Sequence, residues 1–390
     1  MHSLYPTRSQ NQKRIIYLIS FLSSVYLALP IYITSTFLGA YIPERAIGLL
    51  FTGSALVGIG LLSAAPYILR TLGNYRTMLL FTVIESIALV ATVVSTTPLL
   101  IVSAFFFYLA ATSMLPVQLD IFLEDNSQDL TTGDTRGAYL TAGNLGVLVA
   151  PPLVALLLMR NDFRLVFFVT ASLAVPLLFL IRKGFKNFKD PGYDRAPLSA
   201  AFEEIGKNRN LLGIYCINFL LYFFYSWMVI YTPIYLNRSM GFSWSSIGVI
   251  FTVMLLPFVL FELPLGRLAD KKWGEKEILI IGTAIMALAT GALSFIVVPV
   301  AWVFAVALFV TRIGASFVEI GSETYFFKHI QSTDAHLISI FRMTRPVGYV
   351  IGPLVATVLL AFVDIRFLFL ALGIIMLAGL PAGMILKDTK

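Results

Sequence analysis

GRLADKKWGEKE, residues Gly266 to Glu277, is a dense group of charged side chains set between two long apolar runs. Asp270 directly precedes Lys271 and a second lysine, with Gly266 four residues upstream and Gly274 four residues downstream. Gly274 can turn the backbone sharply, because glycine has no Cβ atom. A short charged segment between apolar runs predicts a loop that joins two membrane-spanning helices.

The composition around this loop is that of a membrane protein. Of the 390 residues, 58% are hydrophobic and 13% are charged, with a mean hydropathy of +0.86, whereas soluble domains average about 25% charged residues. A helix needs about 20 apolar residues to cross the hydrocarbon core. The sequence therefore predicts an all-α integral membrane protein with twelve transmembrane helices, at residues 15–38, 46–69, 77–94, 98–123, 136–159, 163–181, 211–236, 244–265, 278–297, 299–326, 336–362 and 365–385. The single cysteine, Cys216, lies in an apolar run and is predicted to be a buried thiol.

The longest polar segment, Arg182 to Arg209, has six predicted spans on each side. We therefore expect an N-terminal six-helix bundle at residues 1–181, a cytoplasmic linker at 182–209 and a C-terminal six-helix bundle at 210–390. The halves also repeat, because LGVLVAPPL in the first half matches VGYVIGPLV 202 residues later. This repeat predicts two pseudo-symmetric bundles.

The charged stretch has its own counterpart in the first half, at Ala65 to Arg76 (APYILRTLGNYR), 201 residues earlier. Gly73 matches Gly274 there, but Leu69 stands where the second copy has Asp270. We therefore expect an acidic side chain to act at only one of the two loops.

Lysine and arginine side chains predict the orientation, because cytoplasmic loops carry an excess of them. With both termini in the cytoplasm, the inner side holds twenty of these residues and the outer side five. The sequence therefore predicts a multi-pass protein of the inner (cell) membrane with cytoplasmic termini. This topology also explains the net charge of +7, so we expect no nucleic-acid partner.

Twelve spans in two halves, a basic linker and the pattern G-x-L-A-D-K-x-x-G from Gly266 to Gly274 together resemble the major facilitator superfamily of secondary transporters. The resemblance covers nearly the whole chain. A partial match to the drug and metabolite exporters of the family begins the fifth span, where Arg136 and Gly137 precede Pro151, although Ala150 replaces the usual glycine. The resemblance implies two bundles that open a central site alternately to the two sides of the membrane.

The resemblance also implies a gating role for the charged loop, with Gly266, Asp270, Lys271 and Gly274 as its motif. In the family such an acid latches the inner ends of the two bundles. Pseudo-symmetry would direct Asp270 to the N-terminus of the fifth span, where the helix dipole favours a negative charge. Arg136 at that N-terminus offers a direct partner.

Glycine and proline in the fifth and eleventh spans form candidate helix hinges, namely Gly146 with Pro151 and Gly352 with Pro353. Small residues let helices approach closely, and a proline leaves a backbone carbonyl unpaired and bends its helix. Ordinary helix packing is the alternative interpretation.

Ionisable side chains within the predicted spans are costly and indicate function by default. Arg312, Glu319 and Glu323 in the tenth span are seven and four residues apart, so they share one helical face. We expect Arg312 to hold an anionic group or to balance Glu319, and a buried carboxylate to carry a proton. In the alternative, which is favoured for Glu323, the acids pair with Arg342 and Arg345 of the eleventh span.

Three further acids lie in the predicted spans. Asp120, in the fourth span, is interpreted as either a proton site or the salt-bridge partner of Arg136. Glu262 is assigned to the network of the charged loop, and Glu85, in the third span, to packing or to the lipid edge.

Polar and aromatic side chains at helical spacing are candidates for lining a cavity. Asn218, Tyr222 and Tyr225 follow one face of the seventh span, Tyr26 lies in the first span and Gln118 in the fourth. Such faces suit a moderately amphipathic organic solute. Packing is again the alternative, because aromatic residues are frequent throughout, with phenylalanine alone occurring 32 times.

These observations favour a secondary active transporter of a small organic solute, linked to protons, with export ahead of uptake. The alternatives are an uptake facilitator or symporter of the same family, and a transporter-like membrane sensor without net flux. We expect no enzyme, cofactor or metal, because the sequence has neither a paired-histidine motif nor a phosphate-binding glycine loop. We further expect a monomer in the lipid bilayer.

Overall fold

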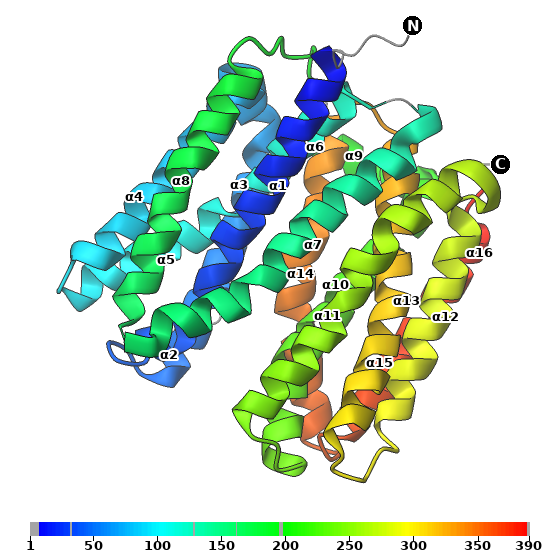
Figure 1. The fold of residues 1–390 in the computed structure, drawn as a ribbon. Helices are drawn as coiled ribbons and strands as arrows, with labels where there is room; N and C mark the ends of the chain where they lie inside the picture. Colours follow the sequence, from blue (N-terminus) through cyan, green and yellow to red (C-terminus); the bar gives the residue numbers. More distant parts are fainter. Residues whose placement is uncertain (1–7, 32, 128, 161, 195–197, 388–390) are drawn as a thin grey trace, which may run out of the picture. The chain divides into compact units, whose positions relative to one another are not determined.

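The computed structural model describes residues 8–31, 33–127, 129–160, 162–194 and 198–387. Every regular element in these ranges is a helix, as the ribbon in Figure 1 shows. Within the described residues, twelve helical segments are long and apolar enough to cross a membrane. The predicted all-α fold with twelve transmembrane helices is therefore confirmed.

Contacts divide the chain into two compact units, each built from three segments. The first unit contains Met1–Ser127, Ala142–Leu198 and Gln331–Met343, and the second contains Gln128–Thr141, Ser199–Ile330 and Thr344–Lys390. Two long helices, α7 (Thr132–Leu157) and α14 (Ala335–Leu360), therefore contribute their first turns to one unit and their remainder to the other.

The first unit is a bundle around α4, with α5, α6 and α8 packed against it and α1 packed against α8, as Figure 1 shows in blue, cyan and green. Besides its parts of α7 and α14, this unit contains α1 (Arg8–Ile31), α2 (Thr34–Leu38), α3 (Glu44–Leu72), α4 (Asn74–Val94), α5 (Pro98–Ala111), α6 (Leu115–Asp125), η2 (Leu158–Arg160) and α8 (Phe163–Phe185).

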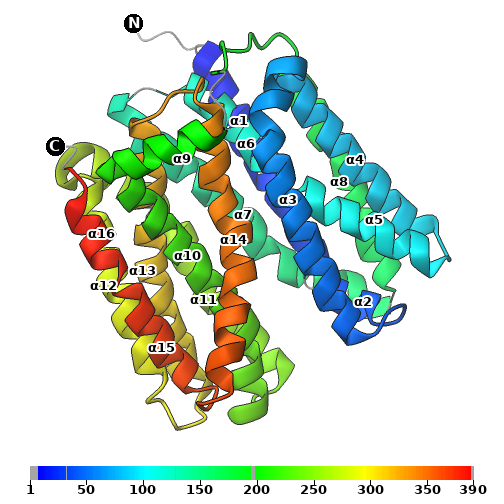
Figure 2. The same ribbon diagram turned by 180° about the vertical axis from the view of Figure 1, so that it is seen from behind.

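The second unit is built around α12 and α13, with α11 on α13 and with α15 and α16 on α12, in the arrangement that Figure 2 shows from behind. Its elements are η1 (Asp129–Thr131), α9 (Leu198–Lys207), α10 (Arg209–Ile234), η3 (Tyr235–Ser239), α11 (Trp244–Leu268), η4 (Ala269–Trp273), α12 (Glu275–Leu293), α13 (Ala301–Lys328), α15 (Phe367–Met376) and α16 (Gly379–Ile385).

Three predicted spans are interrupted in the structure. The first ends at Ile31, after Pro30, and α2 follows as a separate helix. The fourth divides into α5 and α6, with Pro116 in the first turn of α6. The last divides into α15 and α16. In the first two cases a proline lies at the break, where it lacks the N–H that would continue the hydrogen-bond ladder.

The two units do not have the boundaries expected from the sequence repeat. The start of α7 belongs to the second unit and the start of α14 to the first, because each packs on helices of the other half of the chain. The predicted linker also contains a helix, α9, and α8 extends four residues past its predicted end to Phe185. The division of the chain into two six-helix halves stays a prediction.

Candidate functional site

Two glycines allow α7 to meet α11 in the second unit. A Cβ atom on Gly266 would lie 2.1 Å from the carbonyl oxygen of Gly133, and one on Gly133 would lie 2.2 Å from that of Gly266. Only hydrogen fits at both positions, since backbone atoms cannot move aside as a flexible side chain can. This contact brings the N-terminus of α7 to the charged loop.

Asp270 accepts hydrogen bonds from the first backbone N–H groups of α7. Its carboxylate oxygens lie 3.1 Å from the nitrogen of Gly133 and 2.8 Å from that of Asp134. These N–H groups have no partner within the helix, and the helix dipole favours a negative charge there. The expected position of Asp270 at the start of the fifth span is thus observed.

Cations surround this contact. Lys328, the last residue of α13, lies 3.1 Å from Asp270 and 2.5 Å from Glu275, and Arg267 pairs with Asp134 at 2.5 Å. Lys271, although part of the predicted motif, is exposed. The network therefore joins α7, the charged loop and α13.

Arg136 has a different partner from the one predicted. It is fully buried, its Nη1 atom lies 3.6 Å from Glu323, and its guanidinium carbon lies 3.2 Å from the centre of the Phe327 ring. The ion-pair partner of Asp270 is Lys328, so the predicted Asp270–Arg136 pair is wrong. The side chain of Arg136 instead turns to α13, where the Phe327 ring covers it.

The first-half copy of the loop contains a carboxylate that the sequence comparison missed. Gly73 and Gly274 have the same φ of 78°, which supports their alignment. Although Leu69 replaces the acid, Asp190 of the linker accepts hydrogen bonds at 2.6 Å from both the backbone N–H of Asn74 and the hydroxyl group of Tyr193. The repeat itself has no acid at this loop, as the sequence comparison indicated, but an acid from the linker binds there.

The linker around Asp190 is anchored at two more points in the first unit. Arg70 donates to the carbonyl oxygen of Asp194 at 2.9 Å, and the N–H of Asp194 donates to the carbonyl oxygen of Thr333 at 3.1 Å. Burial, together with the hydrogen bond to the Asp190 carboxylate, raises the pKa of Tyr193 above its ordinary value, so this hydroxyl group remains a donor.

Within the second unit, Arg312 and Glu319 of α13 meet at Tyr225 of α10. The Tyr225 hydroxyl group donates to Glu319 at 2.5 Å. The Arg312 guanidinium carbon lies 4.9 Å from the ring centre of Phe224 and 5.5 Å from that of Tyr225. Arg312 is only 2% exposed, and its Nε and Nη1 atoms make no hydrogen bond to any described residue.

This arrangement differs in one respect from the prediction that Arg312, Glu319 and Glu323 act together on one face of α13. Arg312 and Glu319 share an aromatic neighbour on α10, whereas Glu323 is the partner of Arg136. An ion pair was the favoured interpretation for Glu323, but its expected partners were Arg342 and Arg345. Arg312 and Glu319 thus form a polar site apart from the network at the charged loop.

Other predicted residues follow α10. Tyr222 and Tyr225 pack edge to face, with ring centres 5.9 Å apart. The Asn218 amide donates to the hydroxyl group of Thr344 on α14 at 2.7 Å. The three residues lie on one polar face of α10, as their spacing predicts.

The predicted hinges lie where helices approach closely. A Cβ atom on Gly146 would lie 2.5 Å from the carbonyl oxygen of Phe21 on α1, and one on Gly352 would lie 2.0 Å from the hydroxyl group of Ser226 on α10. Pro151 and Pro353 lie inside continuous helices. This geometry supports the packing role, and the hinge role stays a prediction.

Asp120 forms a two-pronged ion pair within the first unit. Arg342 donates to its two oxygens from Nε at 2.6 Å and from Nη2 at 2.8 Å, and Asp120 is fully buried. One of the two interpretations of Asp120 paired it with Arg136, and the alternative interpretation of the acids of α13 paired them with Arg342. The ion pair between Asp120 and Arg342 replaces both of these pairings. It also brings the start of α14 against α6.

Tyr26, Gln118 and Glu85 are buried in the first unit. The Gln118 side-chain amide makes no hydrogen bond to a described residue. The rings of Tyr26 and Tyr108 pack edge to face at 6.2 Å. Glu85 has zero exposure, so its assignment to the lipid edge is wrong; its position in the middle of a span was the signal for a different role.

Glu262 is buried on α11, where its carbonyl oxygen would lie 2.8 Å from a Cβ atom on Gly137. This contact lies beside the α7 N-terminus and agrees with the assignment of Glu262 to the charged-loop region.

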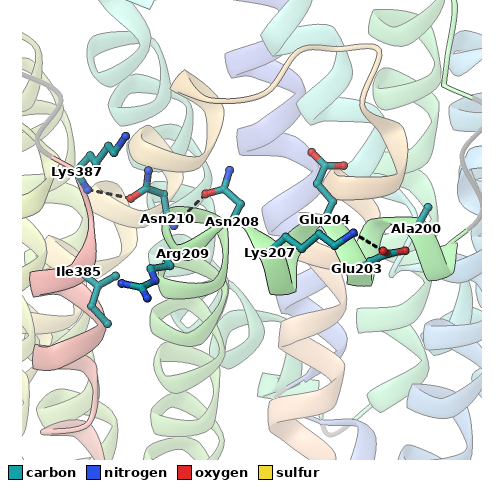
Figure 3. A pocket seen from close by; sticks show the side chains of 9 residues that line it. All are labelled: Ala200, Glu203, Glu204, Lys207, Asn208, Arg209, Asn210, Ile385 and Lys387. Carbon is teal, nitrogen blue, oxygen red and sulfur yellow. Dashed lines mark hydrogen bonds and ion pairs between the residues drawn. The ribbon is translucent and has the colours of Figure 1, made fainter.

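A surface cavity of about 970 Å³ lies at the ends of α9, α10 and α16. Figure 3 shows that Lys207 bonds to Glu203 and that the backbone of Lys387 donates to Asn210 there. None of the predicted site residues lines this cavity. Among the described residues, no group of three His, Cys, Asp or Glu side chains is placed to hold a metal ion.

Comparison with known proteins gives one family. The model of the Major Facilitator Superfamily matches residues 15–249 and 231–390. Among curated proteins none matches the sequence.

Solved structures share the fold at low sequence identity. The human organic anion transporter MFSD10 (TETRAN) has a TM-score of 0.81 at 13% identity, covering 97% of this chain and 100% of its own. The transporter FucP in its outward conformation has a TM-score of 0.80 at 14% identity, covering 98% and 100%. A variant of FucP, the E. coli fucose:proton symporter, has a TM-score of 0.78 at 14% identity with the same coverage.

Proposed function

Because the chain belongs to the major facilitator superfamily, we propose that it is a proton-coupled secondary transporter of a small organic solute that carries an anionic group. The observation that supports the solute class is Arg312, whose guanidinium group is buried against aromatic rings with two nitrogens that bond to no described residue. A buried charge of this kind is costly unless a partner completes it. A carboxylate or phosphate group on the solute would be that partner.

The neighbours of Arg312 support both recognition and coupling. Tyr222 and Tyr225 supply aromatic surface, and Glu319 supplies a carboxyl group bonded to Tyr225. A carboxyl group in a membrane-spanning helix is a candidate proton carrier. One of the structural neighbours is an organic anion transporter and another is a fucose:proton symporter, so both solute and proton transport occur on this fold.

Export is favoured by the partial exporter pattern at the start of α7. Arg136 and Gly137 begin this pattern, and Gly137 lies where a Cβ atom would meet the backbone of α11 at 2.8 Å. A reversed flux, inward under a proton gradient, would assign the chain to uptake instead.

The function can be tested before the solute is identified. The purified protein is screened by thermal unfolding against organic acids, phosphorylated metabolites and neutral analogues, because a ligand that binds the folded state raises its apparent stability. A compound that stabilises the protein is then offered to proteoliposomes with and without a pH gradient. Stabilisation by anions and gradient-driven flux would support the proposal; binding without flux would indicate a sensor.

We propose that Asp270 controls the rate of the transport cycle through its contact with α7. Asp270→Asn removes the charge but keeps a hydrogen-bond acceptor, so the contact weakens. We expect about a tenfold lower turnover, corresponding to the loss of about 1.4 kcal/mol from a charged hydrogen bond at a helix N-terminus, with little change in solute affinity. Flux and equilibrium binding in the same preparation measure the two quantities.

Lys272→Gln is the matched control for Asp270→Asn, because Lys272 is exposed on the same loop. It removes a charge without touching the α7 contact and should leave turnover unchanged. Wild-type turnover and affinity in Asp270→Asn would show that the loop only supports the fold.

We propose that both chain ends and the linker lie in the cytoplasm, supported by the distribution of lysine and arginine. In a variant without Cys216, which is exposed rather than buried as predicted, a cysteine is introduced by Gly192→Cys or by Val298→Cys. An impermeant thiol reagent added outside intact cells should label position 298, in the α12–α13 loop, and not position 192 in the linker. The opposite labelling would reverse the topology.

A further inference from the structure

Glu85 lies near the middle of α4, in the interior of the first unit. Its side chain has zero exposure, and neither carboxyl oxygen makes a hydrogen bond of ordinary length and angle, although the hydroxyl group of Tyr26 lies within reach of the carboxyl group. The hydroxyl groups of Tyr26 on α1 and Tyr108 on α5 are also buried, and the Tyr26 hydroxyl group has both Glu85 and Ser86 within reach. Both tyrosines are close enough to Glu85 to interact with it electrostatically. Glu85, Tyr26 and Tyr108, from three different helices, therefore meet in the interior of the first unit.

No cation faces Glu85 from the described helices that pack against α4. Between Arg164 and Arg182, α8 carries no ionisable side chain, and between Arg45 and Tyr67 neither does α3. On α6 the ionisable groups are Asp120, Glu124 and Asp125.

These carboxyl groups of α6 add no positive charge, and Asp120 is already bonded to Arg342. On α5 the ionisable group is Tyr108, and on α1 it is Tyr26 that reaches Glu85. Arg164 reaches the end of α4, at the carbonyl oxygen of Val93.

A carboxylate that has hydroxyl groups but no cation beside it does not remain charged in such a place. Burial of an ionised carboxyl group without a cation to balance its charge costs so much that the group takes up a proton instead. A purely structural side chain here would be an apolar one, because even a neutral carboxyl group loses its hydrogen bonds to water on burial. The position therefore suits a group whose chemistry requires a proton.

We propose that Glu85 is a proton-carrying site of the first unit, with Tyr26 and Tyr108 as the groups through which its proton is exchanged. This inference rests on the proposed proton-coupled transport and gives it a site separate from Arg312 and Glu319. When the site opens to water, the O–H bond of the carboxyl group breaks and the proton passes to water, either directly or through a tyrosine. In the second case the tyrosine oxygen accepts this proton while its own hydroxyl proton leaves to water.

Infrared spectroscopy of the purified protein tests the proposal without a solute. The carbonyl stretch of an un-ionised carboxyl group is separate from the bands of carboxylates and amides, and it shifts when deuterium replaces the proton. We expect the wild-type protein at neutral pH to show such a band, Glu85→Gln to lose it, and the band to shift after transfer to heavy water. Glu203→Gln, at an exposed position of α9, is the control and should leave the band unchanged.

Two outcomes would overturn the proposal. If Glu85→Gln leaves the band intact, Glu85 is not the group that holds the proton. If the band belongs to Glu85 but does not shift in heavy water, the carboxyl proton does not exchange with water and has a structural role only. If Glu85→Gln fails to fold, Glu85→Asp is measured in its place. This variant keeps a carboxyl group and should retain the band, so a misfolded variant does not hide the answer.

The tyrosine variants test the exchange path. Tyr26→Phe and Tyr108→Phe keep the ring and remove only the hydroxyl group, so the packing is retained. We expect at least one of them to slow the heavy-water shift several-fold; unchanged exchange in both would remove the tyrosines from the path. A negative result in these infrared tests would not contradict solute transport. Flux through the wild-type protein that does not depend on a pH gradient would contradict proton coupling, whatever the infrared band shows.

Discussion

Replacement of Arg312 by Gln is expected to weaken binding of the anionic solute strongly while leaving the stability of the fold nearly unchanged. The guanidinium group is buried against Phe224 and Tyr225, and its Nε and Nη1 atoms have no hydrogen-bond partner among described residues. The substitution therefore removes no native hydrogen bond at those two atoms, and Glu319, whose charge acts on Arg312, keeps its hydrogen bond from Tyr225. Loss of a charged hydrogen bond to the solute, about 1.5–3 kcal/mol, should weaken binding by about 10-fold to 150-fold.

Arg312→Lys separates charge from shape. Lysine keeps the positive charge but cannot form the planar two-pronged contact of arginine, so its affinity should lie between those of wild type and Arg312→Gln. Calorimetric binding of the solute found in the screen, with thermal unfolding of each variant, measures both quantities. A destabilised Arg312→Gln protein with wild-type affinity would make Arg312 a structural residue.

Glu319→Gln is the companion variant, because Glu319 accepts the hydrogen bond of Tyr225 beside Arg312. The amide still accepts that hydrogen bond but cannot exchange a proton. We expect solute counterflow to continue and flux driven by a pH gradient to stop. Gradient-driven flux at the wild-type rate would remove Glu319 from the coupling mechanism.

The fold was predictable because hydropathy decides which segments can cross a membrane. In the hydrocarbon core a helix satisfies all of its own backbone groups, so long apolar runs leave little choice of structure. The breaks within the predicted spans were harder to predict from the sequence. Pro116 divides α5 from α6, but a window of average hydropathy gives the same value with or without the break.

The position of Asp270 was predictable and its ion-pair partner was not. A carboxylate in a loop and an unsatisfied helix N-terminus attract each other by simple electrostatics, and the family resemblance supplied the pairing. Lys328 lies 58 residues further along the chain, at the end of α13. Neither spacing nor periodicity connects residues so far apart, so the partner appeared only when the helices were packed.

The contact of Asp190 with the first loop also could not be predicted from the sequence. The repeat correctly aligned Gly73 with Gly274, and it correctly showed Leu69 in the place of an acid. It could not show that an acid from the linker binds at the same loop, since the linker has no counterpart in the repeat. For Glu85, an almost entirely apolar helix gave no amphipathic face from which to infer burial, so the buried site required the structure.

The buried pair of Asp120 and Arg342 is expected to make the largest contribution to stability among the described ion pairs. Its two short hydrogen bonds form a fork, and the two side chains are 0% and 10% exposed. Removal of one partner leaves an uncompensated buried charge, which costs about 3–5 kcal/mol. Asp120→Asn and Arg342→Gln should each lower the melting temperature by about 10 °C.

The double variant distinguishes pairing from independent packing effects. If the pair acts as a unit, Asp120→Asn combined with Arg342→Gln should be more stable than either single variant, because no unpaired charge remains. The exposed pair of Lys207 and Glu203 is the matched control. Its disruption by Glu203→Gln should cost less than about 1 kcal/mol.

Thermal unfolding in one detergent at one scan rate gives the four melting temperatures of this cycle. Additive losses in the double variant would show that Asp120 and Arg342 are not coupled. In that case Asp120 would again be a candidate proton site, since its charge would not be neutralised by Arg342. If Asp120 and Arg342 are strongly coupled, Asp120 is not available to carry a proton. Glu85 and Glu319 are then the proposed proton-carrying carboxyl groups of the spans.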